Sequence, residues 1–175
     1  IQLVGGLSAV LLYKTDLLLI EFFYGSKLTG LYNASLLPAE YLCFIPSVIQ
    51  MIFLQRTASL YSSNSVSKIN EQIEEGLKYG ILSITLLGVG LFHLSEPFLS
   101  VYFGRNYIDA ALTLRILIIG TFFFGISRGL IPVFQATGWL KYTELVTFSS
   151  MIINMIFNLI LIPRFGIIGA AVGTS

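Results

Sequence analysis

Five stretches of this chain are long and apolar enough to cross a membrane as helices. A spanning helix needs about 20 mostly apolar residues, because the hydrocarbon core is about 30 Å thick and each helical residue rises about 1.5 Å. The 175-residue chain is 55% hydrophobic and 11% charged, whereas a soluble domain is about 25% charged. We therefore predict an all-α polytopic membrane protein with spans at about 3–24, 31–54, 77–102, 110–134 and 145–162, and the start of another at 166.

The connections between these spans are short except for residues 56–76, which we predict to be a polar linker. Cytoplasmic loops of membrane proteins carry more Lys and Arg than the opposite loops. A small excess places 56–76 and 137–142 in the cytoplasm, because one side carries Arg56, Lys68, Lys78 and Lys141 and the other Lys27, Arg105 and Arg164. The sequence does not open with Met and stops where a new apolar stretch begins, so we expect a piece of a longer protein.

Ionisable and amide side chains lie inside the predicted spans. A charge at the middle of the bilayer costs about 2.5–3.5 kcal/mol on insertion scales, so such residues usually face protein or a water-filled cavity. Lys14 and Glu21 share a helix face, whereas Asp16 lies about 200° around the helix from Lys14. Each charge therefore needs a partner on another helix or in water. The later spans carry Asn33, Glu40, Ser47 and Gln50, then Arg128, then Asn154 and Asn158.

We interpret these polar stripes as helices that surround a water-accessible lumen. Two alternatives remain open. Lys14 or Arg128 can form a structural ion pair with an acidic residue, and Asn154 and Asn158 can simply hydrogen-bond a neighbouring helix. Arg115 lies near a helix end, so we expect it to reach the membrane interface and leave it out of the lumen.

Glycine and proline residues predict how the spans pack and bend. Two pairs of glycines spaced four apart indicate close packing within the chain rather than dimerisation: Gly125 with Gly129, and Gly169 with Gly173. Proline removes a backbone donor and bends or breaks a helix. We therefore expect breaks at Pro38, Pro46 and Pro132, which a transporter can use to form sites and hinges within the membrane.

No arrangement typical of catalysis is found in the sequence. There is no phosphate-binding GxxxxGK[ST] motif, and with a single histidine and a single cysteine we expect neither an enzyme nor a metal or cofactor site. We expect His93 and Glu96 to form a hydrogen bond at the interface. A net charge of +1 without a basic cluster gives no indication of nucleic-acid binding.

Four stretches, in order along the chain, resemble polysaccharide exporters of the O-antigen (Wzx-type) flippase kind, in the multidrug/oligosaccharidyl-lipid/polysaccharide exporter superfamily. They are KTDLLLIEFFYGSKLTGLYNAS (14–35), FGRNYIDAALTLRIL (103–117), ATGWLKYTE (136–144) and NLILIPRFGIIGAAVGTS (158–175). The resemblance implies a multi-pass protein of the cytoplasmic membrane of a prokaryote, built of two lobes, with this chain in the second. It also implies that the protein flips a polyprenyl-diphosphate-linked oligosaccharide by alternating access.

Roles for the intramembrane residues follow from that substrate. Lys14 or Arg128 would bind the diphosphate, because a guanidinium can bind phosphate oxygens with two hydrogen bonds. Asn33, Asn154 and Asn158 would suit sugar hydroxyls. Asp16, Glu40 and Glu21 would pair with these cations or bind a coupling H⁺ or Na⁺.

Other functions remain open. A related exporter would carry a lipid-linked peptidoglycan precursor, teichuronic acid or drugs. A membrane-embedded glycan polymerase or ligase, or a scaffold that transports nothing, would be a different class of protein.

Overall fold

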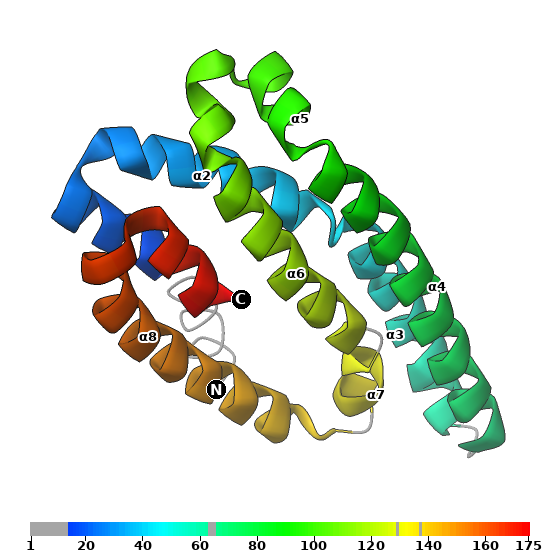
Figure 1. Cartoon of the computed structure of the whole chain (residues 1–175). Coiled ribbons are helices and arrows are strands. Elements are labelled where there is room, and N and C mark those ends of the chain that lie inside the picture. The colour runs from blue at the N-terminus through cyan, green and yellow to red at the C-terminus, as the bar shows by residue number, and fades with distance from the viewer. Residues whose placement is uncertain (1–13, 63–65, 129, 137) are drawn as a thin grey trace.

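The computed structural model describes residues 14–62, 66–128, 130–136 and 138–175, and every secondary-structure element in these ranges is helical (Figure 1). The all-α prediction is therefore confirmed for this part of the chain. The elements are a helix over 14–24, α2 (Ser26–Tyr41), α3 (Phe44–Ser62), α4 (Val66–His93), α5 (Ser95–Tyr102), the 3₁₀ helix η1 (Arg105–Ala110), α6 (Ala111–Ser127), α7 (Ile131–Ala136) and α8 (Leu140–Thr174).

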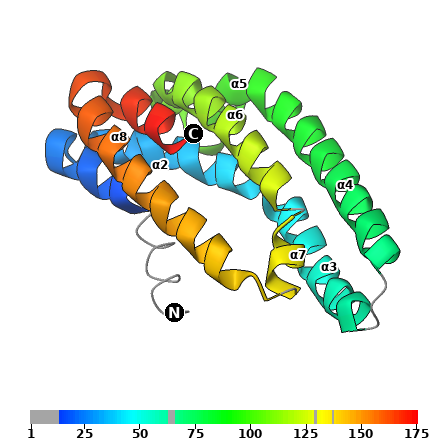
Figure 2. The ribbon, with the colours of Figure 1, turned by 90° about the horizontal axis from the view of Figure 1, so that it is seen from below.

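Helix α6 lies at the centre of the bundle. It contacts α2, α4 and α8, while α3 packs against α4 and α7. Figure 2 shows α8, α6 and α4 side by side in that order. The buried core gathers around α6 and includes Tyr32, Ile84, Leu99, Leu114 and Ile162.

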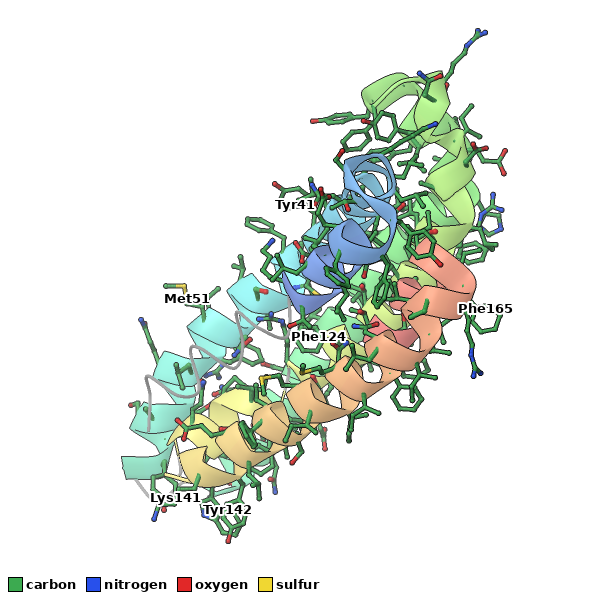
Figure 3. All side chains as sticks on the ribbon, turned by 90° about the vertical axis from the view of Figure 1, so that its left-hand side faces the viewer. Tyr41, Met51, Phe124, Lys141, Tyr142 and Phe165 are labelled. Atoms are coloured by element: carbon green, nitrogen blue, oxygen red, sulfur yellow. The ribbon has the colours of Figure 1, made fainter. Side chains whose placement is uncertain are left out.

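The apolar outer surface fits a protein that crosses a membrane several times. Three helices in the described part are long and apolar enough to span: Ser67–His93, Arg105–Ser127 and Lys141–Thr174. The pair Ser26–Tyr41 and Phe44–Tyr61, bent by 42°, gives a fourth if it counts as one span. Most of the predicted span 3–24 lies outside the described residues. Tyr41, Met51 and Phe165 point outward from the bundle (Figure 3), as expected for side chains in contact with lipid.

Helix breaks occur close to the prolines. Pro46 lies in the first turn of α3, where no backbone donor is needed, and the chain bends just before it at Leu42–Cys43. Pro132 lies in the first turn of α7, which follows a break after α6. The expected breaks at Pro46 and Pro132 are confirmed, whereas Pro38 lies inside α2.

Two predicted segments, 77–102 and 56–76, are each divided between two helices in the structure. Helix α4 ends at His93, so the stretch 77–102 is divided between α4 and α5. Residues 56–76 belong largely to the end of α3 and the start of α4. There the buried Gln72 Nε2 donates hydrogen bonds to Thr57 Oγ1 (2.6 Å) and to Phe53 O (2.8 Å), which joins the two helices.

Helix α8 reverses direction at Gly166. This residue has φ 59° and ψ -136°. Its backbone therefore lies at positive φ, a conformation that favours glycine because glycine has no Cβ atom. Tyr24 Oη donates to Ile162 O (3.1 Å) and to Pro163 O (3.0 Å), two carbonyls beside the kink. The reversal folds 167–174 back onto the preceding helix, as the end of the chain shows in Figure 1.

The returning segment packs closely through its glycines. A Cβ atom on Gly169 would meet Leu161 O, and one on Gly173 would meet Asn158 Oδ1, each closer than real Cβ contacts allow. Close packing of Gly169 and Gly173 within one chain is therefore confirmed. Gly125 likewise lies against Ile84 on α4.

Candidate functional site

A buried polar cluster forms where the helix over 14–24 meets α2 and the end of α8. Asp16 is 1% exposed and is followed by the apolar residues 17–20. Its Oδ2 accepts hydrogen bonds from Tyr32 Oη on α2 and from Thr174 Oγ1 on α8 (3.3 Å), and its Oδ1 accepts one from Leu17 N (2.8 Å). We call Asp16, Tyr32, Asn154, Asn158 and Thr174 the Asp16 cluster.

Two asparagines of α8 extend the cluster. Asn154 Nδ2 donates to Gly173 O (3.2 Å) and lies 3.4 Å from Thr174 Oγ1. Asn158, four residues and one helical turn further on, donates from Nδ2 to Asn154 Oδ1 (3.0 Å). Both side chains are buried, and Asn158 Oδ1 has no hydrogen-bond partner among the described residues. The cluster thus joins three segments through polar side chains and leaves one buried acceptor unused.

The carboxylate of Asp16 has no basic partner among the described residues. The two ion pairs within 4.0 Å in these ranges are Arg56–Glu75 (3.7 Å) and Arg115–Glu96 (3.0 Å). No pair of Lys14 or Arg128 with an acidic residue lies within 4.0 Å in these ranges, although Lys14 is near enough to act electrostatically on Glu40. A buried carboxylate without a cation is costly unless hydrogen bonds, a proton or a bound ion compensate its charge.

Arg128 forms a second site, directly after the last residue of α6 and before the start of α7. Its Nη1 donates to Gln50 Oε1 on α3 (3.1 Å), and its guanidinium carbon lies 4.9 Å from the centre of the Phe124 ring. Its side chain also reaches the Cys43 thiol, while its Nε is buried and has no partner among the described residues. The guanidinium therefore has neutral neighbours and one donor without a partner in the described ranges.

The other predicted site residues lie apart from both positions or at their edges. Lys14 and Glu21 are exposed, while Asn33 and Glu40 are partly buried. No ion pair joins Lys14 to Glu40 in the described part of the chain. Asp16, Asn154 and Asn158 meet in one buried cluster, and Arg128 contacts a different set of residues, while the lumen expected from the sequence stays a prediction.

Sequence reasoning missed two partners of Asp16. Tyr32 gives no polar signal within its apolar stretch, and Thr174 reaches Asp16 because the chain reverses at Gly166. Arg115, which we expected to reach the membrane interface, also has protein partners: its Nε donates to Ser95 Oγ (2.8 Å) and its Nη2 to Glu96 Oε1.

The hydrogen bond predicted between His93 and Glu96 is absent, because both residues have other partners. Glu96 pairs with Arg115, and His93 Nδ1 lies 2.9 Å from Val89 O. Among the described residues, no group of three or more His, Cys, Asp or Glu side chains could hold a metal ion.

Several similar proteins are named as flippases or transporters. The chain is 28% identical over 165 residues to the probable low-salt glycan biosynthesis flippase Agl15 of Haloferax volcanii, a match covering 91% of the chain and 34% of that protein. It is 24% identical over 174 residues to a putative O-antigen transporter of Shigella flexneri (97% and 40%), and 27% identical over 140 residues to the probable lipid II flippase MurJ of Rickettsia prowazekii (77% and 28%).

The chain is homologous to the polysaccharide and lipid-linked flippases. It spans between 28% and 40% of the length of the three relatives named above. No family model matches the chain, and no solved structure matches it. The relatives are named as flippases and transporters rather than as enzymes, in agreement with the lack of a catalytic arrangement in the sequence.

Proposed function

We propose that this chain is part of a flippase that moves polyprenyl-diphosphate-linked oligosaccharides across the cytoplasmic membrane of a prokaryote by alternating access. The sugar and diphosphate need polar groups to replace their hydration, while the polyprenyl tail can stay in lipid. The names of the Haloferax and Shigella relatives support a glycan cargo. The Rickettsia relative favours a second candidate cargo, a lipid-linked peptidoglycan precursor, on the same mechanism. In both cases the chain would supply most of one of two lobes.

The observation that carries the mechanism is the buried carboxylate of Asp16, which has hydroxyl and amide neighbours and no basic partner in the described ranges. Such a group is compensated by a proton or by a small cation such as Na⁺, for which carboxylate, hydroxyl and amide oxygens are suitable ligands. Tyr32, Thr174 and Asn154 supply further oxygens, and Asn158 Oδ1 is an unused acceptor. We assign the Asp16 cluster as the site of the coupling ion.

Arg128 is our candidate for the diphosphate of the cargo. Its acceptor on α3 is the neutral amide of Gln50, and no carboxylate of the described residues pairs with it. A phosphate would therefore be the first negatively charged partner of this guanidinium. Phosphate–guanidinium hydrogen bonds are charge-assisted and stronger than a bond to a neutral amide. In this assignment the coupling ion binds at Asp16 and the diphosphate of the cargo binds at Arg128. Asp16 and the diphosphate therefore do not compete for the guanidinium of Arg128.

The Asp16→Asn substitution tests the ion site in the full-length protein. Asn keeps the size of the side chain and one oxygen acceptor but removes the charge that holds a proton or Na⁺. We expect flipping that no longer responds to a Na⁺ or pH gradient, measured by export of lipid-linked oligosaccharide in cells that lack their own flippase.

Glu21→Gln is the matched control, because Glu21 lies on the same helix and is exposed. We expect this variant to keep the gradient response. A response of Asp16→Asn equal to that of the unaltered protein, at equal protein levels, would remove the coupling role of the cluster.

A further inference from the structure

An apolar groove runs between α4 and α6, away from both polar sites. Its volume is about 340 Å³, and it is lined by Ile84, Thr85, Gly88, Val89, Phe92, His93, Ile118, Ile119 and Phe122. Val89 and Ile119 are each about half exposed, so the groove opens to the outside of the bundle.

The groove is long enough to hold part of an extended hydrocarbon chain. Its α4 side runs from Ile84 to His93. At about 1.5 Å per residue this stretch of helix is about 13 Å long. The hydrocarbon core of a bilayer is about 30 Å thick, so the groove has nearly the length of one leaflet.

A cationic side chain lies at one end of this groove. Arg115 precedes Ile118, Ile119 and Phe122 by three, four and seven residues, so all four share one face of α6. The guanidinium carbon of Arg115 lies 5.8 Å from the centre of the Phe92 ring, which lines the groove. The polar end is near the start of α6 and the end of α4, and the groove continues from there along apolar residues.

Arg115 retains a donor for a ligand. Its Nε bonds Ser95 Oγ and Phe92 O, and its Nη2 bonds Glu96 Oε1, which leaves Nη1 without a protein partner in the described ranges. The ion pair with Glu96 is partly exposed, and such pairs are weak, so it does not prevent a phosphate from binding. His93 also lies at this end, and its Nδ1–H donates to Val89 O, which leaves Nε2 to accept a hydrogen bond.

We propose that this groove binds one membrane glycerophospholipid, with the phosphate on Arg115 and one fatty-acyl chain between α4 and α6. A membrane phospholipid matches both the charge at the end of the groove and its apolar lining. The length along α4 corresponds to one leaflet. The site is distinct from the Asp16 cluster and from Arg128, so the proposal stands or falls independently of the flippase function.

Photo-crosslinking of the full-length protein in lipid nanodiscs tests the proposal. The probe is a phosphatidylethanolamine that carries a photoactivatable group in one acyl chain, and mass spectrometry identifies the labelled residues. We expect labelling of Thr85, Ile119 and Phe122. Arg115→Gln should lower the labelling of these residues by about tenfold, because loss of one charge-assisted hydrogen bond weakens binding by about that factor. Arg115→Lys keeps the positive charge and should retain more of the labelling.

Two glycines of α4 give a matched pair of variants. A side chain on Gly88 enters the groove beside Ile118, whereas one on Gly90 meets open space on another face of α4. We expect Gly88→Phe to remove the labelling of Ile119 and Phe122, and Gly90→Phe to preserve it. Thermal unfolding of both variants shows whether they are folded, and Gly88→Ala, which fits without a clash, replaces Gly88→Phe if that variant unfolds.

Three results would overturn the proposal. One is equal labelling in the Gly88 and Gly90 variants. Another is labelling of outward side chains such as Leu86 with none in the groove, which would show that another protein segment covers it. The third is loss of the label when a polyprenyl phosphate is added to an excess of phospholipid, which would assign the groove to the cargo lipid.

Discussion

The Asp16 cluster and the Arg128 site both place a charged group in an apolar bundle, but they compensate it in different ways. Asp16 is surrounded by hydroxyl and amide groups from three segments that bond each other. Arg128 has neutral neighbours, an aromatic ring beside it and a buried nitrogen without a partner in the described ranges. The bonds among the groups around Asp16 hold three segments together and leave one buried acceptor, Asn158 Oδ1, without a partner in the described ranges, whereas at Arg128 the unpaired group is a donor.

The difference also concerns the helices that carry each charge. The cluster depends on the reversal at Gly166, which brings Thr174 back to Asp16 across the length of the chain. Arg128 lies at a break between α6 and α7 and bonds to α3, the second helix of the bent pair α2–α3. We therefore expect substitutions of the groups that surround Asp16 to lower stability in addition to any effect on coupling, and substitutions near Arg128 to act mainly on transport.

The largest expected effect on stability is that of Gly169→Ala. The added Cβ would meet the backbone oxygen of Leu161, so the returning segment must move away from the preceding helix. Overpacking of this kind costs about 1–3 kcal/mol, and a backbone neighbour places this case at the upper end. The free energy of unfolding in bicelles measures it.

Gly90→Ala is the matched control, because Gly90 lies in a helix and faces open space. It should raise stability by about 0.5–1 kcal/mol through the lower backbone entropy of the unfolded chain. Equal stability of the two variants would mean that the segment 167–174 is not packed as the structure has it.

A smaller loss is expected from Tyr32→Phe, which removes only the hydroxyl group that donates to Asp16. Phe fills the same volume, so the loss reports the hydrogen bond alone. Hydrogen bonds between membrane helices contribute about 0.6–1.7 kcal/mol, and the charged acceptor favours the upper part of that range. The same unfolding measurement in bicelles determines the loss.

Tyr41→Phe on the same helix is the control for this prediction. Tyr41 is 72% exposed. Removal of its hydroxyl should therefore change the unfolding free energy by less than about 0.5 kcal/mol, as is usual for surface substitutions. If the two variants were equally stable, Asp16 would not depend on Tyr32 for compensation of its charge.

The sequence predicted most residues of the Asp16 cluster, but it did not predict the contacts between them. Asp16, Asn154 and Asn158 are recognisable because polar groups are rare in apolar spans, and the spacing of the two asparagines places them on one face of α8. Tyr32 gives little signal, since a tyrosine in an apolar helix reads as a core residue. The contact with Thr174 depends on the backbone angle at Gly166, and a glycine after a proline predicts a helix end without giving the direction in which the chain continues.

The same limit applies to the helix breaks and to the predicted lumen. Proline positions predict bends near Pro46 and Pro132, because the ring of a proline disfavours the helical conformation in the residue before it. Whether two polar stripes face one another depends on the rotation and tilt of each helix, which neighbouring helices determine. For that reason the sequence could place Arg128 and Asp16 on polar stripes without giving the residues that each contacts, which are different in the structure.

The smallest effect on stability, combined with a large effect on transport, is expected from Gln50→Glu. The new carboxylate would lie where Gln50 Oε1 accepts from Arg128 Nη1. It would form an ion pair worth about 0–1 kcal/mol at this partly exposed position. The pair would compete with the phosphate for the guanidinium, so export of lipid-linked oligosaccharide should fall.

Gln50→Met separates the two causes of such a fall, because it removes the acceptor and leaves the charge of Arg128 available to a phosphate. We expect this variant to export lipid-linked oligosaccharide at close to the level of the unaltered protein. Normal export by Gln50→Glu would show that Arg128 contacts no anion during transport. Loss of export by both variants would assign Gln50, rather than the charge of Arg128, to the transport step.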